Sequence, residues 1–191
     1  MNLPNRITLF RMFLIPVLVV IDLIPSLKEI EYFGYLTLAN VIMVAIFLIG
    51  AISDFFDGYL ARKHNLVTSF GKFMDPLADK LLVFASLILL LKQNNVLAPW
   101  VVIVMLGREF VVSGLRMLAA EKGEVIAAGL LGKIKTNIQF LLIVLLLLFG
   151  ETNIHLVWIV NYIVMGAAVI STLWSGIDYV IKGKNIIFES K

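Results

Sequence analysis

Four aspartates in the first half of the chain have the spacing of a metal-binding site. Asp54 and Asp57 are three residues apart, and Asp75 and Asp79 are four apart, so each pair falls on one face of a helix. Asp54 directly follows residues 32–53, an uncharged run long enough to enter a membrane. An ionised carboxylate in such a segment is costly unless it is paired, bound to metal or open to water.

A short basic turn, residues 63–69, joins the two acid-bearing helices, so they should lie antiparallel with their acid faces at the same depth. Clustered carboxylates repel one another, and two divalent ions would balance four negative charges. Oxygen ligands suit Mg²⁺, Mn²⁺ or Ca²⁺, and the chain has no cysteine to offer thiolate ligands. We therefore expect a two-ion site. The alternative is a buried structural network of ion pairs.

Small residues continue both acid faces. Gly58 and Ala61 follow the first pair on its face, and Gly71 precedes the second pair. These residues either let the two helices pack closely or leave room for a flat base and its phosphates, and the spacing leaves both interpretations open. Pro76 removes one helical hydrogen bond and predicts a local kink beside the site.

The composition requires that much of the surface face lipid. Of the 191 residues, 61% are hydrophobic and only 15% are charged, whereas a soluble domain carries about 25% charged residues. The uncharged runs predict an all-α integral membrane protein, one domain over residues 1–191, with six transmembrane helices. We place these helices near residues 6–25, 35–62, 70–92, 97–121, 127–149 and 154–182.

The distribution of basic residues predicts the orientation. With the N-terminus in the cytoplasm, fourteen of the sixteen Lys and Arg residues lie on or nearer to the cytoplasmic side, against Lys28 and Lys92 outside. Cytoplasmic segments of membrane proteins carry the excess of Lys and Arg. We expect a multi-pass protein of the cytoplasmic membrane with its acid pairs facing the cytoplasm. The net charge of +3 follows from this topology, and we expect no nucleic-acid partner.

The acid motif extends beyond the four aspartates and closely resembles the signature of the CDP-alcohol phosphatidyltransferases. No position of that signature is missing: Asp54, Asp57, Gly58, Ala61, Arg62 and, after eight residues, Gly71, Asp75 and Asp79. The resemblance implies a six-helix bundle with a cytoplasm-facing polar cavity, usually a homodimer, in which the aspartates hold Mg²⁺ or Mn²⁺. It implies that Asp79 is the general base. It also implies a CDP site lined by Asp57, Gly58, Ala61, Arg62 and Gly71.

Three further segments resemble the phosphatidylglycerophosphate synthase branch of that family. They are residues 4–11, 107–116 and 131–139. This resemblance implies transfer of the phosphatidyl group of CDP-diacylglycerol to sn-glycerol 3-phosphate, with release of CMP. It places Asn5 and Thr8, on one side of the first helix, near the nucleotide. The alternative for these two is an N-terminal cap or interfacial hydrogen bonds.

A phosphorylated acceptor needs cations, and the later helices supply Arg116, Lys133 and Lys135 toward their cytoplasmic halves. They also supply Arg108, about two helical turns deeper than Arg116. Lys133 and Lys135 are two residues apart, about 200° around a helix, so both cannot point into one pocket. We favour Lys135 for the acceptor phosphate, with Lys133 reaching toward lipid headgroups. Arg108 beside Glu109 is alternatively a structural ion pair.

Two other functions fit part of the pattern. A sister enzyme would use inositol phosphate, serine or phosphatidylglycerol as its acceptor, and the extra cations argue against serine but leave inositol phosphate open. A cation transporter would use the acids to bind its substrate ion. Transporter sites usually lie near the bilayer midplane, often in inverted repeats, whereas these acids lie at helix ends and no repeat is evident.

Overall fold

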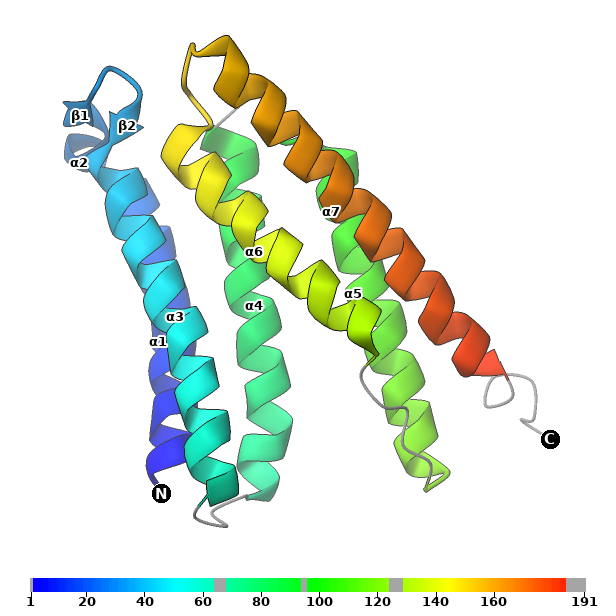
Figure 1. Ribbon diagram of the computed structural model, residues 1–191. Helices are drawn as coiled ribbons and strands as arrows, with labels where there is room; N and C mark the ends of the chain where they lie inside the picture. Colours follow the sequence, from blue (N-terminus) through cyan, green and yellow to red (C-terminus); the bar gives the residue numbers. More distant parts are fainter. Residues whose placement is uncertain (1, 64–67, 94–95, 124–128, 185–191) are drawn as a thin grey trace. The chain divides into compact units, whose positions relative to one another are not determined.

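The computed structural model describes residues 2–63, 68–93, 96–123 and 129–184, apart from the side chains of residues 55, 57–63, 69–70 and 72–73. Within this part of the chain, six long helices lie where the uncharged runs predicted them (Figure 1). They are α1 (Leu3–Leu23), α3 (Leu38–Lys63), α4 (Ser69–Gln93), α5 (Pro99–Glu121), α6 (Leu130–Phe149) and α7 (His155–Lys182). The helical fold class is therefore confirmed.

Three short elements join α1 to α3 and were not predicted. They are α2 (Pro25–Glu29), β1 (Glu31–Tyr32) and β2 (Leu36–Thr37). The two strands pair antiparallel, and the turn between them has positive φ at Phe33 (57°) and Gly34 (72°). Two positive φ angles suit the twist of a tight hairpin. This hairpin moves the start of the second long helix from the expected residue 35 to Leu38.

Contacts divide the chain into two compact units. One comprises Met1–Asn95 with Ile143–Ile154, and the other comprises Val96–Leu142 with His155–Lys191. The first contains α1, α3 and α4, the second contains α5 and α7, and α6 contributes to both. That residues 1–191 form a single domain stays a prediction.

In the first unit, α1 packs against both α3 and α4, and the three helices lie side by side (Figure 1). Their shared core is apolar, with Leu18, Phe47 and Leu87 almost completely buried. Helices α3 and α4 run antiparallel, as predicted (Figure 1), while most of the predicted basic turn between them lies outside the described residues. The acid-bearing ends of α3 and α4 and the N-terminal end of α1 therefore lie at the same end of this unit.

Gly50 lets a side chain of α4 pack directly against α3 just below the acids. A Cβ atom there would lie 2.4 Å from Leu82 Cδ2 on α4 and 3.7 Å from Leu14 Cδ1 on α1. Gly50 precedes Asp54 by one helical turn, and Leu82 follows Asp79 by about one turn. The missing side chain at Gly50 thus leaves room for the Leu82 side chain of α4 one layer below the carboxylates.

Gly50→Ala should destabilise the protein by about 1–3 kcal/mol, because the added methyl group overpacks a buried site against Leu82. In an open position of a helix the same change is favourable, since Ala exceeds Gly in helix propensity by about 1 kcal/mol. Gly166→Ala on α7 is the matched control, because nothing lies within 4 Å of its Cβ position. Thermal unfolding in detergent should show opposite signs for the two variants. Equal midpoints would contradict the close approach at Gly50.

In the second unit, α5 packs against α7, and the polarity of α7 is reversed relative to a helix of a soluble protein. Its buried face includes the polar residues Asn161, Thr172 and Ser175. Its outer face exposes Ile163 and Trp174, which are 65% and 64% accessible. A helix in water places its apolar stripe inward, so this distribution is the one expected where lipid meets the outer face.

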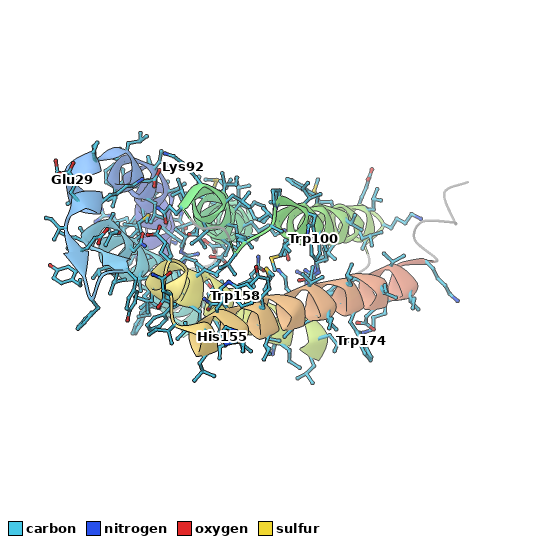
Figure 2. All side chains as sticks on the ribbon, turned by 90° about the horizontal axis from the view of Figure 1, so that it is seen from above. Glu29, Lys92, Trp100, His155, Trp158 and Trp174 are labelled. Atoms are coloured by element: carbon cyan, nitrogen blue, oxygen red, sulfur yellow. The ribbon has the colours of Figure 1, made fainter. Side chains whose placement is uncertain are left out.

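Among the described residues, α6 and α7 are long and apolar enough to cross a membrane, and the apolar part of α3, Leu38–Asp54, is shorter. Trp100 and Trp158 lie at the starts of α5 and α7 (Figure 2). These two helices run parallel (Figure 1), so both tryptophans lie at one end of the unit. Tryptophan is enriched where transmembrane helices meet the membrane–water interface.

A buried carboxylate closes the other end of the first unit, away from the acids. The side chain of Asp22 on α1 is 2% exposed and accepts from Lys28 Nζ at 2.7 Å and Lys92 Nζ at 3.2 Å. It also accepts from Gln93 Nε2 at 2.7 Å. The two cations that the topology prediction placed outside thus join α2 and α4 to the end of α1. Figure 2 marks Lys92 there.

Candidate active site

The acids of α3 and α4 meet at an arginine supplied by α1. Arg11 Nη1 donates to Oδ1 of Asp54 at 2.9 Å, and the same nitrogen donates to Oδ1 of Asp79. Two carboxylates 25 residues apart in sequence therefore contact one positively charged atom. The predicted convergence of the two acid faces is present for this pair. Arg11 had been assigned to the cytoplasmic side from the sequence but not to the site.

Asp75 is held by a second residue of α1. The Thr8 hydroxyl donates to Oδ1 of Asp75 at 2.6 Å. One turn earlier on α1, the Asn5 side-chain oxygen accepts from the Thr68 hydroxyl at 2.9 Å. Gly71 makes this approach possible, because a Cβ there would lie 3.1 Å from the Asn5 oxygen.

The N-terminal cap of α1 is Asn2, whose side chain accepts from the backbone N–H of Asn5. The side chains of Asn5 and Thr8 are engaged with α4 and the residue before it, as the interfacial alternative supposed. Their contact with a nucleotide stays a prediction. The kink at Pro76 also stays a prediction, although α4 runs through that residue.

Arg11 and the two acids that it contacts differ in their exposure to solvent. The Arg11 side chain is 1% exposed, whereas those of Asp54 and Asp79 are 45% and 41% exposed. The guanidinium therefore lies behind the carboxylates, and each carboxylate still faces open space. A buried guanidinium is stable only when it is paired, and these two acids provide the pairing.

The donors present suit a hard divalent cation. Carboxylate oxygens are the ligands that Mg²⁺ and Mn²⁺ prefer, and a positively charged nitrogen already reaches Asp54 and Asp79 together. No group of three acidic or histidine residues poised around one ion is found among the described side chains. The side chains of Asp57, Gly58, Ala61 and Arg62 lie outside that set, so their predicted roles stay predictions.

A mostly apolar groove lies between α1 and α3. Its volume is about 410 Å³, and it is lined chiefly by Ile7, Phe10, Ile49, Ile52 and Phe56. Arg6 and Ser53 are its polar lining residues. Phe10 and Ser53 are the immediate neighbours of Arg11 and Asp54 in sequence, but neither Arg11 nor Asp54 lines the groove. Its lining suits a hydrocarbon chain.

In the second unit, two positively charged side chains contact one glutamate. Lys135 Nζ and Arg108 Nη1 both donate to Oε1 of Glu109, at 2.6 Å and 2.8 Å. Arg108 Nη2 also donates to the Ser175 hydroxyl on α7. The ion pair between Arg108 and Glu109 considered from the sequence is present, and Lys135 joins it. These three ionic side chains are largely buried.

Tyr179 on α7 lies beneath two of the predicted phosphate-binding cations. The guanidinium carbons of Arg108 and Arg116 lie 5.4 Å and 5.6 Å from the centre of its ring. An aromatic face attracts a cation within about 6 Å, so one buried ring orients both arginines. The sequence analysis gave Tyr179 no role. Its distance of 63 residues from Arg116 in the chain offered no signal.

Lys133 and Lys135 separate as their spacing predicted. Lys135 is 3% exposed and paired with Glu109, whereas Lys133 lies on the exposed side of α6. Thr136, also exposed, donates to the backbone carbonyl of Gly132. The geometry makes Lys135 part of a buried cation cluster and leaves Lys133 at the surface.

Comparison with known proteins identifies the family. Residues 1–174 match the family described as CDP-alcohol phosphatidyltransferase. This chain belongs to the CDP-alcohol phosphatidyltransferase family. The match covers both units and includes every residue proposed for the site.

Relatives within the family agree in their names. The CDP-diacylglycerol–glycerol-3-phosphate 3-phosphatidyltransferase of Bacillus subtilis is 51% identical over 150 residues, covering 77% of each chain. A protein of the same name from Rickettsia typhi is 41% identical over 180 residues, covering 93% of this chain and 94% of its own length. One from Salmonella choleraesuis is 38% identical over 183 residues, covering 93% and 92%. The second and third of these similarities extend over nearly the whole chain.

Proposed function

We propose that this protein transfers the phosphatidyl group of CDP-diacylglycerol to sn-glycerol 3-phosphate, giving phosphatidylglycerophosphate and CMP. The observation that carries the proposal is the meeting of Asp54 and Asp79, from two helices, at the head of α1. That arrangement sits within the complete acid signature of the family. The names of relatives at 41–51% identity support this choice of donor and acceptor.

Asp54, Asp57, Asp75 and Asp79 would hold two divalent ions, Mg²⁺ or Mn²⁺. Bound there, such ions neutralise the pyrophosphate of the donor and stabilise the departing phosphate of CMP. The chain's own contribution is to keep the carboxylates together from behind, through Arg11 and Thr8. Asn5, Thr8, Gly58, Ala61, Arg62 and Gly71 would line the CDP site.

Asp79 would act as the general base. Its carboxylate is 41% exposed, so a hydroxyl group of the acceptor can approach it. One oxygen is held by Arg11, which fixes the direction in which the carboxylate faces. The acceptor hydroxyl gives its proton to Asp79 as its oxygen bonds to the lipid-side phosphorus, and the bond to the CMP phosphate breaks. The groove between α1 and α3 would take an acyl chain of the donor.

The acceptor phosphate would bind among Arg108, Arg116 and Lys135, with Lys133 at the surface. Glu109 offsets part of the charge of Lys135 and Arg108. Arg116, exposed and lying over Tyr179, completes a cluster of net positive charge. Such a cluster favours an acceptor that carries a phosphate over an uncharged alcohol or serine.

The protein would be a multi-pass enzyme of the cytoplasmic membrane, with six spans and with its N-terminus and acids on the cytoplasmic side. The apolar lengths of α6 and α7, the reversed polarity of α7 and the asymmetry of basic residues support this topology. We also infer a homodimer, from the resemblance to the family.

An acceptor panel tests the proposed function. Purified protein with CDP-diacylglycerol and Mg²⁺ or Mn²⁺ should release CMP with glycerol 3-phosphate and release little with inositol phosphate, serine or phosphatidylglycerol. Release should be measured by chromatography of CMP and of the lipid product. Equal or better turnover with inositol phosphate would move the chain to a sister activity. If no acceptor released CMP while the protein bound divalent cations, cation transport would become the better explanation.

A further inference from the structure

Arg11 occupies a place that the proposed reaction does not explain by itself. It is a positively charged side chain, 1% exposed, beneath two carboxylates that would themselves bind cations. A site that needs only to attract divalent ions gains nothing from a resident positive charge, because like charges repel. The contact must therefore serve another purpose.

The geometry of the contact indicates that purpose. One nitrogen of the guanidinium reaches Oδ1 of Asp54 on α3 and Oδ1 of Asp79 on α4. Hydrogen bonds to a rigid planar group restrict the rotation of each carboxylate. Both carboxylates are more than two-fifths exposed on their other side, so the arginine holds them without covering them.

Charge balance points the same way. The like-charged carboxylates of Asp54 and Asp79 repel one another and would turn apart in the absence of a cation. Arg11, which contacts both, changes the net charge of this group from −2 to −1. The arginine thus lowers the repulsion that holds the two carboxylates apart.

We propose that Arg11 is the positioning residue of the metal site, orienting Asp54 and Asp79 from behind so that their exposed oxygens bind the ions. This inference rests on the proposed function, because it takes the two aspartates as metal ligands. Groups that hydrogen-bond to metal ligands commonly contribute about 10- to 100-fold to metal affinity. Arg11 adds orientation and charge balance from α1 to ligands that stand on α3 and α4.

Mn²⁺ binding to the purified full-length protein, followed by electron paramagnetic resonance, tests the proposal without reliance on turnover. Arg11→Met removes the donor and the charge, and it should weaken Mn²⁺ binding by about 10-fold or more. Arg11→Lys keeps the charge but lacks the planar fork, so its affinity should lie between those of Arg11→Met and the natural protein. Lys92→Met is the matched control: it removes a cation of the same unit at its other end, and should leave Mn²⁺ binding unchanged.

Thermal unfolding with EDTA and with Mn²⁺ checks that each variant folds, and if Arg11→Met does not fold, Arg11→Lys carries the test alone. Tighter Mn²⁺ binding in the variants would mean that Arg11 competes with the ions, and unchanged binding would mean that it orients nothing; either result overturns the proposal. These outcomes leave the proposed function intact if the natural protein binds Mn²⁺ and passes the acceptor panel. A natural protein that binds no Mn²⁺ would overturn the metal site, and this inference with it.

Discussion

Asp75→Asn should reduce phosphatidyl transfer by roughly a thousand-fold or more while the protein still folds. Loss of one group that stabilises transition-state charge typically costs 10²- to 10³-fold in rate, and a metal ligand also sets the occupancy of the site. Asn keeps the shape of Asp, and its side-chain oxygen can still accept from the Thr8 hydroxyl, which lies 2.6 Å from Asp75. The substitution therefore removes the charge and preserves the contact between α1 and α4.

The measurement is CMP release at saturating CDP-diacylglycerol, glycerol 3-phosphate and Mg²⁺, with thermal unfolding to confirm the fold. Asp178→Asn is the matched control, because Asp178 pairs with Lys182 at the end of α7 in the other unit. It should keep nearly full activity. Activity of Asp75→Asn within 10-fold of the natural protein would refute its role as a metal ligand. Asp57→Asn should reduce phosphatidyl transfer to a similar extent, because Asp57 is also proposed as a metal ligand.

Lys135→Ala should raise the KM for glycerol 3-phosphate by about 10- to 100-fold, with a smaller change in the KM for CDP-diacylglycerol. A charged hydrogen bond contributes about 1.5–3 kcal/mol, and 1.4 kcal/mol corresponds to a factor of ten in binding. Lys135 is buried and shares one oxygen of Glu109 with Arg108. Its removal leaves the glutamate to compete with the acceptor phosphate for Arg108, which weakens phosphate binding further.

The control for the Lys135→Ala prediction is the same substitution at Lys133, two residues earlier in the chain. Lys133→Ala removes the same charge from the exposed side of the same helix and should change the KM for glycerol 3-phosphate by less than about threefold, since exposed charges are screened by solvent. Initial rates across a range of acceptor concentrations give both values. If Lys135→Ala left the acceptor KM unchanged, or if both variants raised it equally, the phosphate would have to bind elsewhere.

The long helices were predictable because their apolar runs exceed what a soluble chain would carry. The hydropathy of single helices was less informative. Only α6 and α7 of the described helices pass a test for membrane crossing, since α1, α4 and α5 carry charged residues within their length. Those charges include Asp75, Asp79, Arg108 and Arg116, which are proposed for the site. The hairpin before α3 was not predicted, because only two residues of each strand pair. The feature that marks it is the positive φ of Gly34, which is known only from the structure.

The spacing of the acids predicted that Asp54 and Asp79 face the same region, because helical periodicity is a local property. It could not show that Arg11 lies between them, since a contact 43 residues away in sequence depends on how α1 packs. The same limit applied to Lys135, which reaches Glu109 across 26 residues. Gly50 was overlooked for a related reason, because a glycine in an apolar run gives no sign of which helix will press against it.

The two ionic anchors of α1 have a consequence for the surrounding bilayer. Between Arg11 and Asp22 lie ten uncharged residues, which span only about 15 Å as a helix, whereas the hydrocarbon layer is about 30 Å thick. If α1 crosses the membrane, at least one of its paired charges lies at a depth that normally belongs to acyl chains. Lipids next to this unit must then thin or tilt to match it, and the phosphorus of a lipid donor can meet the carboxylates without leaving its leaflet.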